Sequence, residues 1–173
     1  QITCTPVNTS DEDGDNLTYV VNWYRDDNSL TVLNMPFDSN VSSVSEGKIR
    51  DYSSYGINGT LGNGNSNNAP SYMKGTNCVI GGCYEFDGDD YISISTSAGG
   101  NLDQDVFTIS AWIYPTVSDA NIRRIFQRAD STYGLYINSG KVYFYVDTTN
   151  DGGSLKSVNL SVTLDSWSYV AGV

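Results

Sequence analysis

Apolar and polar residues alternate along most of the chain, and no segment sustains the repeat of about 3.6 residues that an α-helix requires. Side chains of a β-strand point to opposite faces in turn, so a period of two indicates strands. Turn residues such as Asn138-Ser139-Gly140 separate the alternating segments. The pattern predicts an all-β protein with strands at Leu17 to Tyr24, Tyr91 to Thr96, Phe107 to Tyr114, Tyr133 to Ile137, Val142 to Val146, Leu155 to Leu164 and Trp167 to Val173.

Many short strands at this spacing favour a jelly roll or sandwich of packed sheets. The segment Phe107 to Tyr114 carries apolar or aromatic side chains on both faces, which is typical of an internal strand. We therefore expect Trp112 and Trp167 to pack inside the protein rather than to bind a ligand.

The segments on either side of the Asn138-Ser139-Gly140 turn predict a β-hairpin. One face of this hairpin carries a row of tyrosines, Tyr136, Tyr143 and Tyr145. Two interpretations of the row stay open, because aromatic side chains form binding platforms and also simply fill sheet faces. We name the three tyrosines as candidate ligand-binding residues.

Charge and composition exclude several classes of function. The 173 residues include nine Lys and Arg against twenty Asp and Glu, a net charge of −11, so nucleic acid is not an expected partner. No apolar run approaches the roughly 20 residues of a membrane span, so we expect no membrane insertion. The absence of histidine removes His-dependent hydrolases and imidazole zinc sites.

The cysteines and the glycosylation sequons favour an extracellular or cell-surface location. Cys78 and Cys83 have the spacing of a short-range disulfide, which leaves Cys4 without a partner in this sequence. Sequons for N-linked glycosylation occur five times, at Asn8, Asn16, Asn40, Asn58 and Asn159.

Five segments in order resemble the laminin-G-like branch of the concanavalin A-like lectin/glucanase superfamily. The most specific are the Phe86-Asp-Gly-Asp-Asp-Tyr-Ile92 and Phe107-Thr-Ile-Ser-Ala-Trp112 elements. The resemblance implies a concanavalin A-like jelly-roll sandwich of two antiparallel sheets that binds glycans or proteins outside cells. The segments are Leu33 to Asp38, Asp51 to Leu61, Ile80 to Ile92, Phe107 to Pro115 and Trp167 to Val173.

The resemblance also sets the expected domains. Residues 33–173 form the laminin-G-like jelly roll, from which the family's C-terminal hairpin is missing. Residues 1–32 are similar to part of an immunoglobulin-like module, with Cys4 and Trp23 at its core positions, as in archaeal or bacterial surface proteins. We expect polypeptide outside this chain, including neighbouring copies, to complete the segments Ile2 to Tyr24 and Trp167 to Val173.

Aspartates of these family segments suggest a calcium site. Asp87, Asp89 and Asp90 lie on one turn, and Asp38 and Asp51 belong to the neighbouring segments. Calcium takes six to eight oxygen ligands, so we expect these five carboxylates to contribute, although Asp and Gly also build turns without a metal. A second acidic turn, Asp11 to Asp15, is better explained as a solvated turn.

We predict no enzymatic activity. Glycoside hydrolysis needs two carboxylates about 5 to 10 Å apart, and the Glu-x-Asp-x-x-Glu motif of the glucanase branch is absent. The predicted function is a non-catalytic extracellular adhesion module of a cell-surface or filament-forming protein, with a glycan, a surface protein or copies of itself as partners. The alternatives are a calcium-dependent lectin module and an appendage of a glycoside hydrolase.

Overall fold

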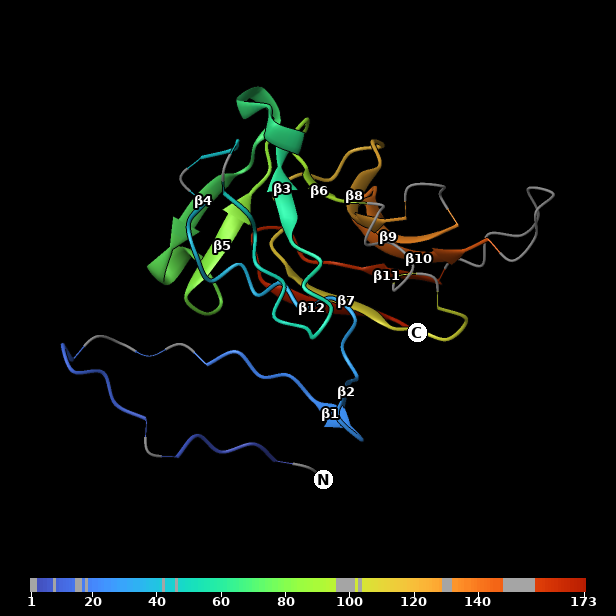
Figure 1. Cartoon of the computed structure of the whole chain (residues 1–173). Helices are drawn as coiled ribbons and strands as arrows, with labels where there is room; N and C mark the ends of the chain where they lie inside the picture. Colours follow the sequence, from blue (N-terminus) through green and yellow to red (C-terminus); the bar gives the residue numbers. More distant parts are fainter. Residues whose placement is uncertain are drawn as a thin grey trace. The chain divides into compact units, whose positions relative to one another are not determined.

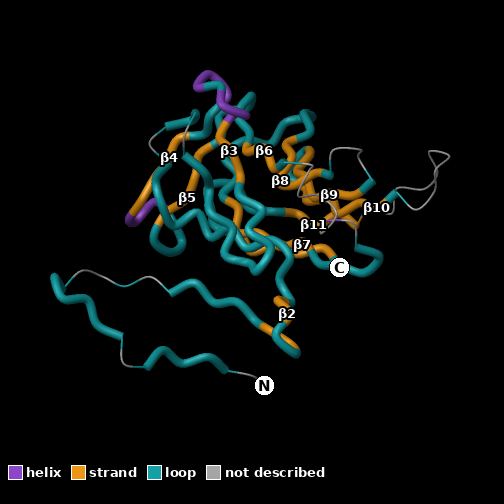
Figure 2. Tube along the Cα trace, viewed as in Figure 1, coloured by secondary structure: helices purple, strands orange, loops and turns teal. Residues whose placement is uncertain are grey.

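Short antiparallel strands make up the fold (Figure 1). The computed structural model describes residues 3–7, 9–14, 17, 19–41, 43–45, 47–95, 102, 104–128, 132–147 and 158–173. The chain divides into two units, Gln1–Asp103 and Gln104–Val173. The helical elements whose bounds the structure describes are short 3₁₀ turns, drawn in purple in Figure 2, so the all-β prediction is confirmed: η1 Gly62–Gly64, η2 Ser66–Asn68 and η3 Gly75–Asn77.

The first unit consists of three separate antiparallel strand pairs. Its strands are only two to four residues long, because glycine, asparagine and serine interrupt the apolar alternation throughout this part of the chain. The pairs are β1 Tyr24–Arg25 with β2 Asn28–Ser29, β3 Gly59–Leu61 with β6 Ile92–Ile94, and β4 Ser71–Lys74 with β5 Gly82–Glu85.

The N-terminal part of the first unit has almost no sheet. Of the strand expected at Leu17 to Tyr24, the described residues show only the short β1, and those before it are drawn as loop in Figure 1. Cys4 is exposed with a free thiol, and Trp23 is 41% exposed. Since neither side chain lies in a core, the immunoglobulin-like segment is not confirmed.

The core of the first unit forms around three buried side chains, Ile49, Leu61 and Tyr84. The Tyr84 ring makes edge contacts with Phe37 and Tyr72, at centroid distances of 5.6 and 5.3 Å. Its hydroxyl donates to the Ser39 carbonyl oxygen and accepts from the Val41 amide, both at 3.1 Å. Burial raises the pKa of this phenol, so Tyr84 serves as a neutral core residue with its polar atom satisfied.

A buried carboxylate organises the loop between residues 49 and 59. Asp51 is 5% exposed, and its side chain accepts four hydrogen bonds. Oδ1 accepts from the Asn34 and Ser53 amides at 2.8 and 2.9 Å. Oδ2 accepts from the Ser53 hydroxyl at 2.6 Å and the Ile57 amide at 2.7 Å. The carboxylate therefore substitutes for the backbone partners that an irregular loop lacks.

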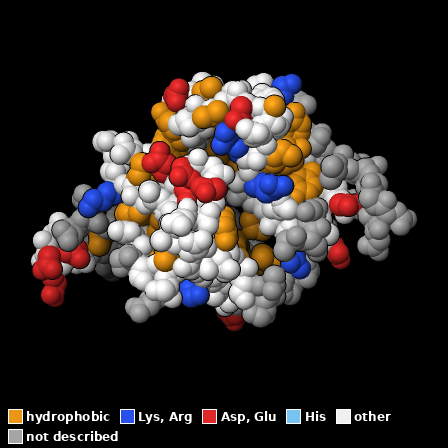
Figure 3. Space-filling view, turned by 90° about the horizontal axis from the view of Figure 1, so that it is seen from above, with side chains coloured by type: hydrophobic (Ala, Val, Ile, Leu, Met, Phe, Trp, Pro, Cys, Tyr) orange, Lys and Arg blue, Asp and Glu red, His pale blue; other side chains and the backbone are white. Residues whose placement is uncertain are grey.

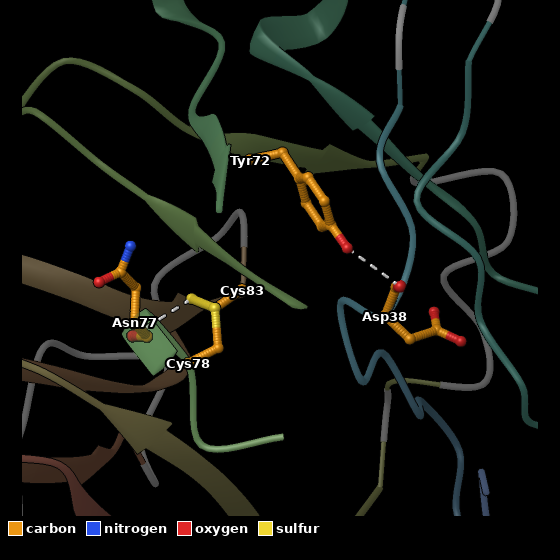
Figure 4. Close-up of a disulfide and its surroundings, with 5 residues drawn as sticks. All are labelled: Asp38, Tyr72, Asn77, Cys78 and Cys83. Atoms are coloured by element: carbon orange, nitrogen blue, oxygen red, sulfur yellow. Dashed lines mark hydrogen bonds between the residues drawn. A yellow bond between two sulfur atoms is a disulfide. The ribbon is translucent and has the colours of Figure 1, made fainter. Parts of the chain in front are cut away.

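The disulfide predicted between Cys78 and Cys83 is present, with its Cα atoms 5.6 Å apart. Figure 4 shows that it connects the end of η3 to β5, where Cys83 Sγ lies 3.8 Å from the Asn77 carbonyl oxygen. The same view shows the Tyr72 hydroxyl directed at the main-chain oxygen of Asp38, at 3.1 Å. The disulfide therefore restrains the start of β5, the strand that leads to the acidic turn.

The second unit is a small sandwich of two antiparallel sheets. One sheet has four strands and the other has two, and neighbouring strands in both sheets are antiparallel. This arrangement agrees with the predicted sandwich. The first sheet has the order β11 Val158–Ser161, β10 Lys141–Val146, β9 Tyr133–Asn138 and β8 Arg123–Gln127, and the second pairs β12 Ser168–Gly172 with β7 Ile109–Ile113.

The predicted hairpin is β9 and β10, which pair from Asn138 and Lys141 outward. Ser139 and Gly140 form its two-residue turn with φ values of 49° and 70°. Positive φ at both positions matches the twist of the strands, which explains why a glycine occupies the second position.

The two sheets meet at Leu135, which is completely buried, together with Ile137 and Val142. Apolar residues of β7 and β12 pack on this cluster. At one point the sheets approach so closely that only glycine fits, because a Cβ on Gly172 would lie 2.2 Å from the Phe144 ring.

Replacing Asp51 with asparagine should destabilise the first unit by about 3 kcal/mol, because the amide group would face a buried N–H that then has no acceptor. The measurement is hydrogen exchange at the Ile57 amide, which should lose protection while the Leu135 amide in the second unit does not. Asp38→Asn is the matched control, since the Tyr52 hydroxyl can still donate to an amide oxygen. Equal effects of the two substitutions would contradict this role for Asp51.

Gly172→Ala should destabilise the second unit by roughly 1–3 kcal/mol, because the new methyl group overlaps the Phe144 ring. Urea-dependent hydrogen exchange at the Leu135 amide measures the loss. Ala171→Ser, at the exposed neighbouring position, is the control and should leave the exchange unchanged. If the Gly172→Ala variant is as stable as the parent chain, the two sheets can move apart enough to accept the methyl group without a loss of stability.

Candidate functional site

Three aspartates converge on the turn between β5 and β6. Asp87, Asp89 and Asp90 place carboxylate oxygens within 4.8 Å of one another. Asp87 and Asp89 are exposed and Asp90 is half-buried. This spacing allows one divalent cation to contact all three carboxylates, with water or main-chain oxygens as its other ligands.

The acidic turn is held in place by its own hydrogen bonds and by Asn68. The Asp87 amide donates to Asp90 Oδ2 at 3.0 Å, and Gly88 between them has a φ of 128°. Asn68 Nδ2 donates to the main-chain oxygen of Asp89 at 3.1 Å, while the Asn68 carbonyl accepts from the Tyr91 amide at 3.0 Å. These hydrogen bonds hold the turn that carries the three carboxylates.

Crowding of like charges is visible in the electrostatics of the turn. The pKa of Asp89 is raised, first by a side-chain hydrogen bond with Asp87 and then by the Asp87 charge. Two carboxylates at this separation favour sharing a proton. A bound cation would relieve the same repulsion, so protons and metal ions compete for the turn.

The structure does not group Asp38 or Asp51 with the three aspartates of the turn. Asp38 Oδ2 accepts from the Tyr52 hydroxyl at 2.8 Å, and this hydrogen bond raises the pKa of Tyr52. Asp51 has four protein donors, as described above. Metal ligation by these two residues stays a prediction.

The other acidic turn has the geometry of an ordinary Asx turn in its described part. The Asp13 amide donates to Asp11 Oδ1 at 2.9 Å, and the Gly14 amide donates to the Asp11 carbonyl at 3.3 Å. Asp15 lies outside the described residues.

The tyrosines of the β9–β10 hairpin lie together on one face of the four-stranded sheet. Tyr136 and Tyr143 are cross-strand partners whose rings stack at 5.0 Å with an interplanar angle of 8°. Tyr145 is 8% exposed and lies over Gly134, where a Cβ would come within 2.7 Å of its ring. Burial and the neighbouring Tyr143 raise the pKa of Tyr136. The rings therefore cover the sheet and each other, and ligand binding by them stays a prediction.

Among the described residues, a strongly exposed aromatic pair lies instead on the two-stranded sheet of the second unit. Trp112 on β7 and Tyr169 on β12 are directly opposite in register, with ring centroids 5.3 Å apart. They are 52% and 58% exposed. Beside them the Tyr114 ring, 45% exposed, contacts the half-buried Trp167 at 5.5 Å. We call Trp112, Tyr114, Trp167 and Tyr169 the aromatic face.

The prediction that Trp112 packs internally is therefore wrong. Its alternation partners Thr108 and Ser110 are polar and exposed, whereas Ile109 and Ile113 on the opposite face contact the core. These polar neighbours indicate that this side of the strand faces solvent. The large apolar tryptophan on the same side led to the opposite prediction.

The glycosylation sites fall in different surroundings. Asn40 is exposed. Asn58 is also exposed, but its Oδ1 accepts from the Asp51 amide at 2.9 Å, so its side chain takes part in the loop. Asn8 and Asn16 lie outside the described residues, as does the side chain of Asn159. Glycosylation stays a prediction at all five sites.

Most of the molecular surface seen in Figure 3 is neither acidic nor basic. Figure 3 shows uncharged polar and main-chain atoms over much of one face, with acidic, basic and apolar groups scattered among them. No helix in the described part of the chain has the length and apolar character needed to cross a bilayer.

Comparison with known families identifies the superfamily of this chain. A laminin G family model, described as the concanavalin A-like lectin/glucanases superfamily, matches residues 86–173. The match begins at the acidic turn and includes the whole second unit. No curated protein and no solved structure matches the chain significantly. With its two-sheet architecture, the match shows that the chain belongs to the concanavalin A-like lectin/glucanase superfamily.

Proposed function

We propose that this chain is a non-catalytic extracellular module that binds carbohydrate through the aromatic face. The observation that carries the proposal is the exposure of Trp112 and Tyr169, which are side by side and each more than half in water. Large aromatic groups at such exposure are unfavourable in an isolated protein, and adjacent exposed rings are typical of binding surfaces.

Carbohydrate is the ligand class that fits this face best. The C–H groups on one side of a pyranose ring are apolar and pack on aromatic rings, while its hydroxyls need polar partners. The hydroxyls of Ser110, Tyr114 and Tyr169 supply such partners on the same side of β7 and β12. Two neighbouring rings offer contacts to successive sugar units of one chain.

The non-catalytic part of the proposal rests on the sequence. The chain has no histidine, and it lacks the paired glutamates on one strand that the hydrolytic branch of the superfamily uses. The extracellular location is supported by the disulfide between Cys78 and Cys83, since such bonds persist in oxidising compartments.

Trp112→Ala and Tyr169→Ala should each weaken carbohydrate binding by roughly threefold to tenfold, because each removes one stacking surface. A glycan array identifies a ligand, and affinity electrophoresis in a gel that contains this glycan measures the loss. Tyr55→Ala removes a tyrosine that is 42% exposed in the first unit, and serves as the matched control. Failure of the parent chain to bind any glycan, or unchanged binding by Trp112→Ala, would exclude the proposal.

A calcium ion at the acidic turn is a second proposed feature, supported by the convergence of Asp87, Asp89 and Asp90. The oxygen-only ligands and the adjustable glycine-containing turn suit calcium better than magnesium, which demands regular octahedral geometry. Such an ion would stabilise the turn rather than catalyse a reaction.

Calcium should raise the melting temperature of the chain, by an amount equivalent to about 2.7 kcal/mol at a concentration of 100 times Kd. Asp89→Asn should abolish the shift, whereas Asp105→Asn, at an exposed position of the second unit, should preserve it. The raised pKa of Asp89 means that protons bind the turn more readily than a free carboxylate, so calcium affinity should fall on acidification. Differential scanning fluorimetry with and without chelator tests this, and a melting temperature that ignores calcium would rule the site out.

A further inference from the structure

An open cavity in the first unit is lined by a lysine together with uncharged polar residues and an isoleucine. It measures about 360 Å³ and lies where β3, β6 and η1 meet. A volume of this size is at the lower end of the range for small-molecule sites, about 300–1,000 Å³. The lining residues are Lys48, Thr60, Asn63, Ser93, Ile94 and Ser95.

We propose that this cavity binds the oxyanion of an acidic saccharide, with Lys48 as the group that recognises the charge. This site is in the first unit and involves none of the residues of the aromatic face, so it extends the proposed function without depending on it.

Lys48 is an exposed lysine with no carboxylate partner among the described residues. Its Nζ donates one hydrogen bond, at 3.0 Å, to the Thr60 hydroxyl. No carboxylate lies within ion-pair distance of Lys48 among the residues that the structure describes, and none lines the cavity. An ammonium group has three N–H donors, so two remain for a ligand. Because Lys48 is exposed, water solvates these two donors in the free protein, and a ligand oxyanion can replace that water.

The other lining groups provide hydrogen bonds to a polyhydroxylated ligand. The Ser93 hydroxyl lies 3.3 Å from both the Thr60 carbonyl and Asn63 Oδ1. Accepting that hydrogen bond fixes which end of the Asn63 amide faces Ser93, and leaves its N–H₂ group without a partner in the described part of the chain. The Ile94 side chain adds an apolar surface for the C–H groups of a sugar ring.

The cavity is preorganised by the backbone. Thr60 and Ser93 are cross-strand partners in the β3–β6 pair. Asn63 has a φ of 52° between two glycines, and a Cβ on the first of them, Gly62, would lie 2.8 Å from the Asn68 main chain. The close approach of Gly62 to the Asn68 main chain restrains the turn that carries Asn63 beside the β3–β6 pair.

The charge of the whole chain does not prevent anion binding. The net charge of −11 repels anions at long range. At physiological ionic strength the screening length is about 8 Å, so the lysine that directly contacts the ligand outweighs distant carboxylates.

The test is a titration of the ¹⁵N-labelled chain with galacturonic acid, galactose and inorganic sulfate, followed by NMR. Galacturonic acid should shift the amide signals of Thr60, Asn63 and Ser93, and galactose should bind much more weakly. Lys48→Gln should weaken galacturonic acid binding roughly fivefold, as expected for one exposed charge pair. Lys74→Gln removes an exposed lysine from β4 and should leave binding unchanged.

Three results would overturn the proposal: equal binding of galactose and galacturonic acid, unchanged binding by Lys48→Gln, or equal losses in Lys48→Gln and Lys74→Gln. Sulfate that binds as tightly as galacturonic acid would assign the cavity to simple ions and refute its preference for a saccharide. Trp112→Ala should leave this titration unchanged, which separates the outcome from that of the aromatic face.

Discussion

The alternation of side chains on β7 and β12 is the constraint on which the second unit depends. Because successive residues of a strand face opposite sides, Ile109, Ile113 and Val170 can close the core over Leu135 only if the residues between them face outward. Two of those outward residues are Trp112 on β7 and Tyr169, its cross-strand partner on β12. The same backbone geometry therefore creates both the packed interior and the exposed aromatic surface, and a one-residue slip would destroy both.

The first unit is stabilised in a different way. Strands of two to four residues bury little apolar surface, so polar groups connect its loops. Asp51 joins the segment at Asn34 to its own loop through main-chain amides, and the Tyr84 hydroxyl fixes the loop at residues 39–41. Further polar contacts hold the acidic turn to Asn68 and place the Lys48 ammonium beside the Thr60 hydroxyl.

The sequence predicted those elements that local pattern determines. The β9–β10 hairpin has regular alternation and a turn with a suitable glycine. The two cysteines of the disulfide are only five residues apart, a spacing that indicates a short-range bridge. The role of Asp51 was not predictable, because its four donors come together only in the folded loop. The predicted orientation of Trp112 is wrong because the apolar character of this one side chain was given more weight than the polar Thr108 and Ser110 on the same face.

The three proposed binding features differ in how charge affects them. A cation at Asp87, Asp89 and Asp90 is attracted by the acidity of the whole chain, whereas an anion at Lys48 must overcome that field through direct contacts. Stacking on the aromatic face depends on apolar surface and changes little with ionic strength. Added salt would therefore weaken cation binding and leave aromatic stacking intact. At the Lys48 cavity it would screen the attraction and the background repulsion together, so binding there would change less than at an isolated ion pair.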